Sequence, residues 1–396
     1  MKNPFNRRMS VFDAKAIDET IRRALASAGL STTSGPLRSV TETIKRALSP
    51  GKHDSARFPV AGDDVIDVTA RVVDGGDAQD TGSRRTPPIG QAQVAASFER
   101  HEFSNPAGAR NYKLYVPAAI EQPPPLLVML HGCTQSADDF AAGTAMNRLA
   151  DEHGLLVVYP EQAASANPSK CWNWFKAQDQ LRDSGEPSLI AGIVREVAAR
   201  HGVDSRRIFV AGLSAGAAMA VILGETYPEL FAGVGAHSGL PYGSAHDIPS
   251  AMAAMKGGRS GMAGLMNLPG AAAGPGPGAV RAVPTIVFHG DRDHTVQPTN
   301  GAEIFEQAKA AHSALASGVA MRVNSGSGTS SGGRSYSRTT HADASGQPTI
   351  ESWTLHGAGH AWSGGDESGS YTDSKGPDAS AEMLRFFLAL PRAGSA

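Results

Sequence analysis

The chain has 396 residues, with 36 Lys and Arg against 38 Asp and Glu and a formal net charge of −2 at pH 7. This length allows two ordinary domains or one large domain with extensions, and the near-neutral charge disfavours a nucleic-acid partner. Two cysteines exclude a disulfide-rich scaffold and a four-cysteine zinc site. No stretch approaches the roughly 18 uninterrupted apolar residues of a membrane span. The basic N-terminus has no apolar segment after it, so we expect no signal peptide.

Residues 1–95 differ from the rest of the chain. ETIRRAL at 19–25 recurs as ETIKRAL at 42–48, and apolar residues fall at helical spacing around the first copy. So few apolar residues hardly form an independent core. We therefore expect two solvated amphipathic helices on a flexible leader, with a small helical hairpin as the alternative. Residues 50–95 are rich in Pro, Gly and Asp, which is typical of a linker.

From about residue 96 to 391 the pattern is strand, loop and helix, repeated, which predicts an α/β domain with a mostly parallel sheet. The expected strands are 111–116, 126–132, 155–161, 207–212, 231–237, 285–290 and 350–357. Helices are expected near 139–152, 188–200, 215–226, 299–315 and 378–389. The strands are continuous apolar runs, as buried parallel strands are. Segments 241–282 and 324–333 interrupt the alternation, and we expect both to be surface excursions.

A candidate nucleophile lies in the run Gly212-Leu213-Ser214-Ala215-Gly216, between an apolar strand and a helix of small residues. A G-x-S-x-G turn in this context presents the serine at the carboxyl edge of the sheet, and its glycines allow close backbone approach. The same pattern recurs around Ser330, but in a Gly/Ser-rich loop without a strand before it. The context therefore favours Ser214.

A base and an acid follow the serine in the chain. His360 comes after the strand 350–357, and both Asp291 and Asp293 come after the strand 285–290. The order serine, aspartate, histidine is that of α/β-hydrolases. We favour Asp293 as the acid, because Asp291 directly follows a glycine and would hold the turn. Three other histidines at strand ends are expected to pack or to order loops: His131, His237 and His289.

An ester hydrolase also needs donors for the oxyanion, and the backbone amides of Cys133 and Ala215 are placed to supply them. Aromatic side chains are dense nearby, and they would either line an acyl or polymer-chain groove or form a satellite core. These side chains are Trp172, Trp174 and Trp362. The sequence contains no H-E-x-x-H motif or closely spaced cysteine pair, so we expect no metal and no cofactor.

In combination, LHGCTQSADDFAAGTAMNRLADEHGLLVVYPEQ, CWNWF, GLSAG, HGDRDHTV and GAGHAWSGG resemble esterases of the polyhydroxybutyrate depolymerase type, which are close to feruloyl and acetylxylan esterases. The resemblance covers about residues 100–390. It implies an α/β-hydrolase fold and a triad of Ser214, Asp293 and His360. It also implies cleavage of a polyester, its oligomers or smaller esters. The alternatives are a carbohydrate esterase and a non-catalytic hydrolase fold used for binding. Oligomeric state is left open.

The two cysteines bear on the compartment. A bridge between Cys133 and Cys171 would tie the loop that carries Cys133, here called the oxyanion loop, to residues 171–175, here called the tryptophan segment. The resemblance implies export. The missing signal peptide favours the cytoplasm and reduced thiols, so the bridge is left open. If it forms, the two Cα atoms should lie within about 4.4–6.8 Å, and a separation beyond about 7 Å would exclude it.

Segment 241–282 leaves the sheet at its carboxyl edge, where the triad is expected. We interpret it as a flexible lid over an acyl pocket, with a passive surface loop as the alternative. Its apolar side chains are Met252, Met255, Met262, Leu265 and Met266.

Overall fold

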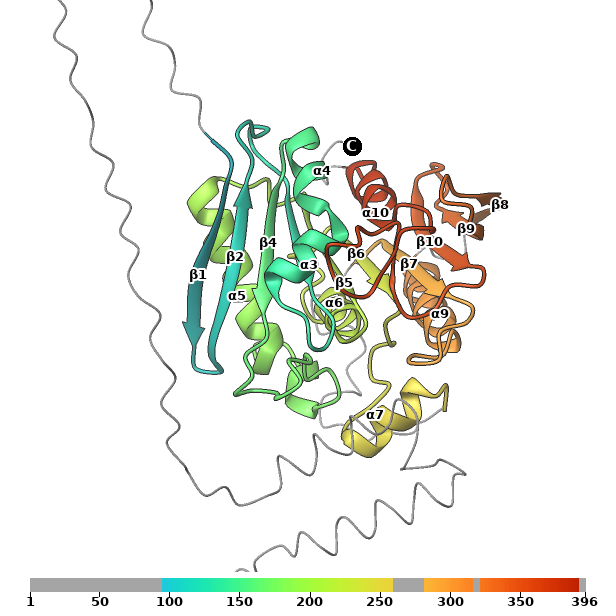
Figure 1. Ribbon diagram of the computed structural model, residues 1–396, viewed down its shortest axis with the longest axis horizontal. Helices are drawn as coiled ribbons and strands as arrows, with labels where there is room; N and C mark the ends of the chain where they lie inside the picture. Colours follow the sequence, from blue (N-terminus) through green and yellow to red (C-terminus); the bar gives the residue numbers. More distant parts are fainter. Residues whose placement is uncertain (1–94, 259–280, 316–320, 392–396) are drawn as a thin grey trace, which may run out of the picture. The chain divides into compact units, whose positions relative to one another are not determined.

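The computed structural model describes residues 95–258, 281–315 and 321–391 (Figure 1). The chain divides into two units, Met1–Arg85 and Thr86–Ala396, and all the described residues belong to the second. The helices and linker expected in residues 1–95 lie outside the described residues, except for Ala95, and stay predictions. Residues 259–280 of the expected lid also lie outside the described residues.

One large sheet organises the described unit, with the strand order β1-β2-β4-β3-β5-β6-β7-β10-β9-β8. The six strands from β4 to β10 in this order run parallel, and antiparallel strands flank them on both sides. The strands are β1 (Ser97–Asn105), β2 (Gly108–Val116), β3 (Leu126–Leu130), β4 (Leu156–Glu161), β5 (Ile208–Leu213), β6 (Gly233–His237), β7 (Thr285–Gly290), β8 (Arg322–Thr329), β9 (Ser335–Ala342) and β10 (Pro348–Leu355).

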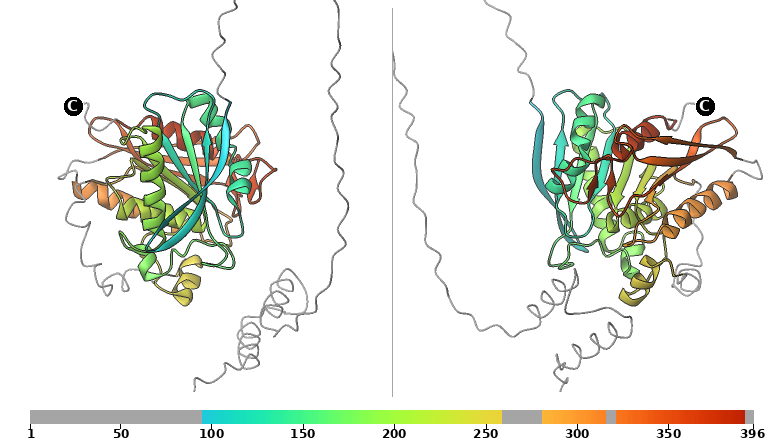
Figure 2. Two further views of the ribbon diagram at one scale, coloured as in Figure 1. Left: turned by 90° about the vertical axis from the view of Figure 1, so that its left-hand side faces the viewer. Right: turned by 45° about the vertical axis from the view of Figure 1, so that its right-hand side comes forward.

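Helices cover both faces of the sheet (Figures 1 and 2). They are α3 (Ala137–Thr144), α4 (Met146–His153), the 3-10 turn η1 (Ala177–Gln180), α5 (Gly185–His201), α6 (Ala215–Thr226), α7 (Ile248–Met255), α9 (Thr299–Leu315) and α10 (Ala379–Leu388). A small second sheet pairs β11 (Trp362–Ser363) with β12 (Thr372–Asp373). Within the described residues, no helix is both long and apolar enough to cross a membrane.

Two apolar clusters lie on opposite faces of the sheet. On one face Ile190 of α5 and Leu223 of α6 are buried with the strands. On the other, Phe140 of α3, Leu149 of α4 and Phe387 of α10 are buried. Burying apolar area on both faces stabilises the fold at roughly 25 cal/mol per Å². The loops at the carboxyl edge are thereby mounted on a rigid sheet.

The predicted α/β domain with a mostly parallel sheet is confirmed, and each expected strand is present. The helix expected near 139–152 is two helices, because Ala145 adopts a left-handed φ of 50° between α3 and α4. Segment 324–333 lies at the surface as expected, but most of it is a strand and not an irregular loop. Residues 322–329 form β8, which pairs with β9 through backbone hydrogen bonds that need no apolar side chains. The polarity of β8 reflects its exposed position at the sheet edge.

Part of the interrupting segment 241–282 is also ordered. Its Met/Ala stretch forms α7, capped by Asp247, whose side chain accepts the amide of Ser250. The carbonyl of Met255 accepts the amide of Gln297 at 2.8 Å, which ties α7 to the loop that follows β7. Met252 is exposed, whereas Met262, Leu265 and Met266 lie outside the described residues.

Candidate active site

Ser214 lies in a strained turn between β5 and α6. Its backbone has φ 56° and ψ −120°, a left-handed conformation that costs a non-glycine residue about 1–3 kcal/mol. The side chain is partly exposed, although nearly all of β5 and α6 is buried. A strained and accessible serine at the carboxyl end of a central strand is the arrangement of a nucleophile elbow.

The flanking glycines are required by close backbone contact. A Cβ on Gly216 would overlap the carbonyl oxygen of Leu130 in β3, and one on Gly212 would lie 2.7 Å from the same oxygen. Because β3 leads into the oxyanion loop, the elbow and that loop are packed backbone to backbone. This close approach is the physical reason for glycine on both sides of Ser214.

His360 and Asp293 meet at the same edge of the sheet. The Nδ1–H of His360 donates to Asp293 Oδ2 at 2.7 Å, which leaves Nε2 as the acceptor. The carboxylate of Asp293 is buried, and its Oδ1 accepts the amides of Thr295 and Val296 at 2.9 Å each. The imidazole of His360 is 12% exposed. The pair therefore has an oriented ring and a fixed tautomer, with Nε2 left as an acceptor.

Burial by itself would raise the pKa of Asp293. Hydrogen bonds from His289 and His360, the charge of His360 and the amide of Val296 outweigh it and hold the pKa well below its usual value. The ring of His289 lies 3.4 Å from Asp293 Oδ2 through Nε2. Asp293 is therefore ionised at neutral pH, as a group that stabilises an imidazolium must be.

Ser214 and His360 are not hydrogen-bonded to each other within the described structure. Their backbones are nevertheless held through His237: its carbonyl oxygen accepts the Ser214 amide at 2.9 Å, and its Nε2 accepts the Ser363 amide at 3.1 Å. Catalytic hydrogen bonds are often long before substrate binds and tighten in the complex. The expectation that His237 packs or orders a loop is confirmed, because its ring stacks on Trp362 and holds the loop at Ser363. No local motif marks its link to Ser214.

Asp291 pairs with a different histidine. Its Oδ2 lies 3.0 Å from His356 Nδ1, and its Oδ1 accepts the Gly357 amide at 2.7 Å. His356 Nε2 lies 2.8 Å from Ser337 Oγ, so Ser337, His356 and Asp291 form a continuous chain of hydrogen bonds. Its Asp and His side chains are 39% and 43% exposed, and Ser337 lies within β9 and not at a helix N-terminus. Ser337 thus lacks the strained turn and the helix N-terminal amides that are found at Ser214.

Among the described residues, most backbone amides at the start of the loop after β3 have acceptors, but that of Cys133 does not. The Gly132 amide donates to Gln135 Oε1, and the amides of Thr134 and Gln135 donate to the carbonyls of Ser169 and Gly132. In the described part of the chain, the Cys133 amide has no such acceptor. The amide of Ala215 is the first of α6 and has no acceptor within the helix. These two amides are the donors expected from the sequence.

Cys133 and Cys171 form a disulfide. Their Cα atoms are 4.2 Å apart, just under the lower bound of the expected range and well within the limit for a bridge. The question that the sequence left open is thus answered in favour of the bridge, which joins the oxyanion loop to the tryptophan segment. Sequence separation across the bridge is 38 residues.

The three tryptophans are buried, with exposed fractions of 0% for Trp172, 6% for Trp174 and 1% for Trp362. Trp172 packs on the ring of His131 and Trp362 stacks on His237. Both indoles thus pack against residues at the strand ends that carry the loops of the site. Fully buried indoles cannot line an open groove. We therefore leave Trp172 and Trp362 out of the substrate-contacting residues, and the alternative of a packed core describes them better.

Ser330, in the second G-x-S-x-G match, is an ordinary turn residue. Its Oγ donates to the carbonyl of Lys375 at 2.5 Å and accepts the Arg334 amide. Among the described residues, no group of three or more His, Cys, Asp or Glu side chains is arranged to hold a metal ion.

The chain is similar in sequence to several known proteins. The family described as esterase PHB depolymerase matches residues 110–327. Poly(3-hydroxyalkanoate) depolymerase C of Paucimonas lemoignei is 34% identical over 278 residues, 69% of this chain and 63% of that protein. A probable acetylxylan esterase A of Aspergillus fumigatus is 31% identical over 238 residues, 58% of this chain and 60% of that protein. The chain thus spans under two thirds of the length of these relatives.

A solved structure shares the fold. The acetyl xylan esterase from Aspergillus awamori superposes with a TM-score of 0.55 at 20% identity, over 74% of this chain and 99% of that one. The described unit therefore has the α/β-hydrolase fold. With the family match extending over more than half of its residues, the chain belongs to the esterase PHB depolymerase family.

Proposed function

We propose that this protein is a serine carboxylic ester hydrolase with Ser214 as nucleophile, His360 as general base and acid, and Asp293 as the group that orients the base. The observation that carries the proposal is the 2.7 Å contact from His360 Nδ1 to a buried Asp293, on the sheet edge where Ser214 occupies a strained turn. Family membership supports the same chemistry. No cofactor enters the reaction.

In this mechanism Nε2 of His360 takes the proton of Ser214 as Oγ attacks the ester carbonyl. The amides of Cys133 and Ala215 stabilise the oxyanion of the tetrahedral intermediate. His360 then gives the proton to the departing alcohol, and an acyl-enzyme remains. Water, deprotonated by the same imidazole, releases the acid in a second half-reaction. The ionised Asp293 stabilises the imidazolium in both halves.

Loss of the nucleophile tests this assignment. Ser214→Ala should lower kcat for p-nitrophenyl butyrate by about 10⁴–10⁶. Ser330→Ala and Ser337→Ala are matched controls, because both serines sit in a similar pattern or hydrogen-bond chain outside the elbow. Wild-type activity in Ser214→Ala would refute the assignment. Failure of an organophosphonate to label Ser214 would favour the non-catalytic alternative.

For the substrate, we propose hydroxyalkanoate polyesters or their oligomers, supported by the 34% identity to a poly(3-hydroxyalkanoate) depolymerase. A carbohydrate esterase is the second candidate, because acetylxylan esterases occur among the relatives in both sequence and fold. Rates on hydroxybutyrate oligomers, acetylated xylan and methyl ferulate separate the two. A preference for the carbohydrate esters would exclude the polyester proposal.

The disulfide bears on the compartment. Bridges of this kind persist in oxidising compartments and are rare where thiols are kept reduced. The Cys133–Cys171 bridge therefore supports the proposal that the protein works outside the reducing cytosol.

A further inference from the structure

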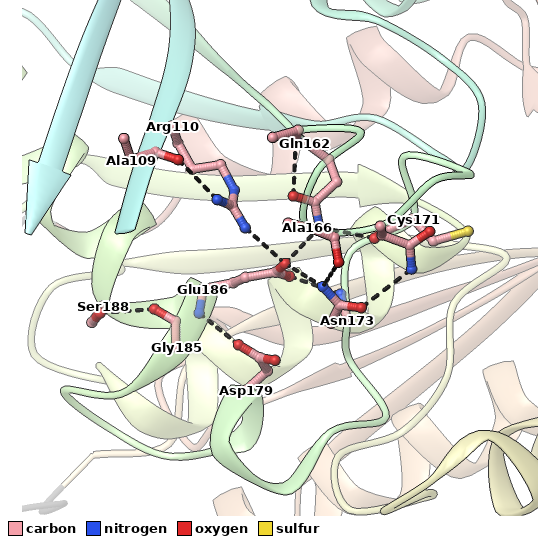
Figure 3. Close-up of polar contacts among 12 residues, drawn as sticks. Ala109, Arg110, Gln162, Ala166, Cys171, Asn173, Asp179, Gly185, Glu186 and Ser188 are labelled. Atoms are coloured by element: carbon pink, nitrogen blue, oxygen red, sulfur yellow. Dashed lines mark hydrogen bonds and ion pairs between the residues drawn. The ribbon is translucent and has the colours of Figure 1, made fainter. Parts of the chain in front are cut away.

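A buried carboxylate, that of Glu186, lies among polar side chains from several segments and is not part of the proposed triad (Figure 3). Glu186, in the first turn of α5, is 3% exposed. Arg110 Nη2 donates to its Oε1 at 3.0 Å, Gln162 Nε2 at 2.5 Å and Asn173 Nδ2 at 2.6 Å, while the Asn173 amide donates to Oε2 at 2.7 Å. One carboxylate thus gathers donors from three other parts of the chain.

These donors hold the segment around Cys171 from both sides. Asn173 is two residues beyond the cysteine, and Gln162 Nε2 also donates to the carbonyl of Cys171 at 2.8 Å. Cys171 is bonded to Cys133, whose amide is one of the two proposed oxyanion donors. The first route from Glu186 to the oxyanion therefore runs through the disulfide.

A second route runs through a histidine. The backbone amide of Gln162 donates to His131 Nε2 at 3.0 Å. The proton of the ring is therefore on Nδ1, which donates to the carbonyl of Gly132 at 2.7 Å. Burial lowers the pKa of His131 and keeps the ring neutral, as this tautomer requires. Gly132 immediately precedes Cys133. Both routes end on the same peptide unit.

We propose that Glu186 is a positioning residue for catalysis, which sets the location of the Cys133 amide through Gln162 and through the disulfide-linked segment. A buried ion pair with Arg110 would by itself contribute little to stability, since the desolvation of both charges offsets their attraction. The four hydrogen bonds converge on the Glu186 carboxylate, and two of them come from Asn173, so Glu186 gives the segment that contains Cys171 and Asn173 a defined position. The inference rests on the proposed function, because it assigns Glu186 to the oxyanion step of that reaction.

Glu186→Gln keeps the shape of the side chain but turns one acceptor oxygen into a donor among groups that already donate. We expect kcat for p-nitrophenyl butyrate to fall about 10–100-fold with KM within about 3-fold, since a misplaced oxyanion donor acts on the transition state. The inhibition constant of a trifluoromethyl ketone, whose adduct carries the oxyanion, should rise by a similar factor. If Glu186 had a merely structural role, kcat would not fall selectively while KM stayed constant, and the inhibition constant of the trifluoromethyl ketone would not change.

The chain offers a matched control in Glu351, another buried carboxylate, which pairs with Arg385 and accepts Trp353 Nε1 at 2.8 Å in β10. Glu351→Gln should lower stability to a similar extent but leave kcat within about 2-fold, because its contacts do not reach the oxyanion loop. Reduction of the disulfide should lower kcat more in Glu186→Gln than in the wild type, since the two constraints hold one segment.

If Glu186→Gln lowers kcat no more than Glu351→Gln does, the inference is wrong. If Glu186→Gln does not fold, Gln162→Met tests the inference instead. This substitution removes the side-chain amide that joins Glu186 to Cys171. A wild-type kcat in Gln162→Met would equally overturn the inference. A wild-type protein that hydrolyses no ester would instead refute the proposed function, so the two failures are distinct.

Discussion

The carbonyl oxygen of His237 accepts the backbone amide of Ser214, 2.9 Å away. The same residue reaches the other side of the site, because its Nε2 accepts the amide of Ser363, three residues after His360. Its ring stacks on Phe288 at 5.8 Å and on Trp362 at 5.2 Å. His237 thus joins the turn of the proposed nucleophile, Ser214, to the loop that carries the proposed base, His360.

His237 must stay neutral to serve as this acceptor. Burial, with smaller contributions from the charges of His289 and His360, lowers its pKa to about 3. His237→Phe keeps the stacking but leaves the Ser363 amide without its acceptor, which should cost about 1–3 kcal/mol of stability. We expect kcat to fall about 10-fold or more with little change in KM. His237→Gln, which has an acceptor oxygen, should recover part of the loss; equal activity of wild type and His237→Phe would contradict the role.

Asp293→Asn should lower kcat by about 10⁴, because the amide favours the wrong tautomer of His360. Asp291→Asn is the matched control and should stay within about 3-fold, since Asp291 pairs with His356. Equal losses in both variants would exclude Asp293 as the orienting acid.

The same substitution should change how stability depends on pH. The folded pKa of Asp293 lies below its unfolded value, so its ionised form stabilises the protein above the unfolded value of about 3.9. That contribution is lost as the pH falls through the folded pKa. Urea unfolding of wild type and Asp293→Asn at pH 7 and pH 3 should show a larger difference at pH 7.

Asp179 has the opposite dependence. Burial, and then the charge of Glu186, raises its pKa from 3.8 to about 6. The folded state holds the proton between these values, so stability falls as the pH rises through this range and stays lower above it. Asp179→Asn keeps an acceptor for the Glu186 amide and should stabilise the protein at pH 8 by up to about 3 kcal/mol. At pH 3.5 the two proteins should unfold at nearly the same urea concentration; a gain independent of pH would contradict this.

Gly216→Ala should damage the elbow. Its Cβ would overlap the carbonyl of Leu130, so we expect a loss of about 1–3 kcal/mol in unfolding free energy together with reduced kcat. Gly326→Ala in the exposed strand β8 is the control, because a Cβ there has no heavy atom within 4 Å. Thermal unfolding and ester hydrolysis of the two variants measure the difference.

The residues that could be found in advance are those whose role depends on near neighbours in the chain. The elbow around Ser214 occupies five consecutive residues after a strand, and Asp293 and His360 each follow a strand end within a few residues. Strand ends of a parallel sheet meet at one edge, so placing these residues on strands was enough to bring them together. The apolar runs likewise predicted every parallel strand. Strands β1, β8 and β9, all in the antiparallel flanks of the sheet, were missed. In β8 the residues are polar and exposed, and backbone pairing leaves little trace in such an edge sequence.

Contacts between distant segments could not be found in this way. Glu186 binds partners 13, 24 and 76 residues away, and none of the four residues forms a motif with another. The tryptophans looked like groove residues because their density is visible in sequence while their burial is not. A buried polar side chain is explained by the donors around it, and these are brought together by packing of the sheet and α5. The proposed reactive groups thus follow from local pattern, whereas the residues that hold them in place follow from the fold.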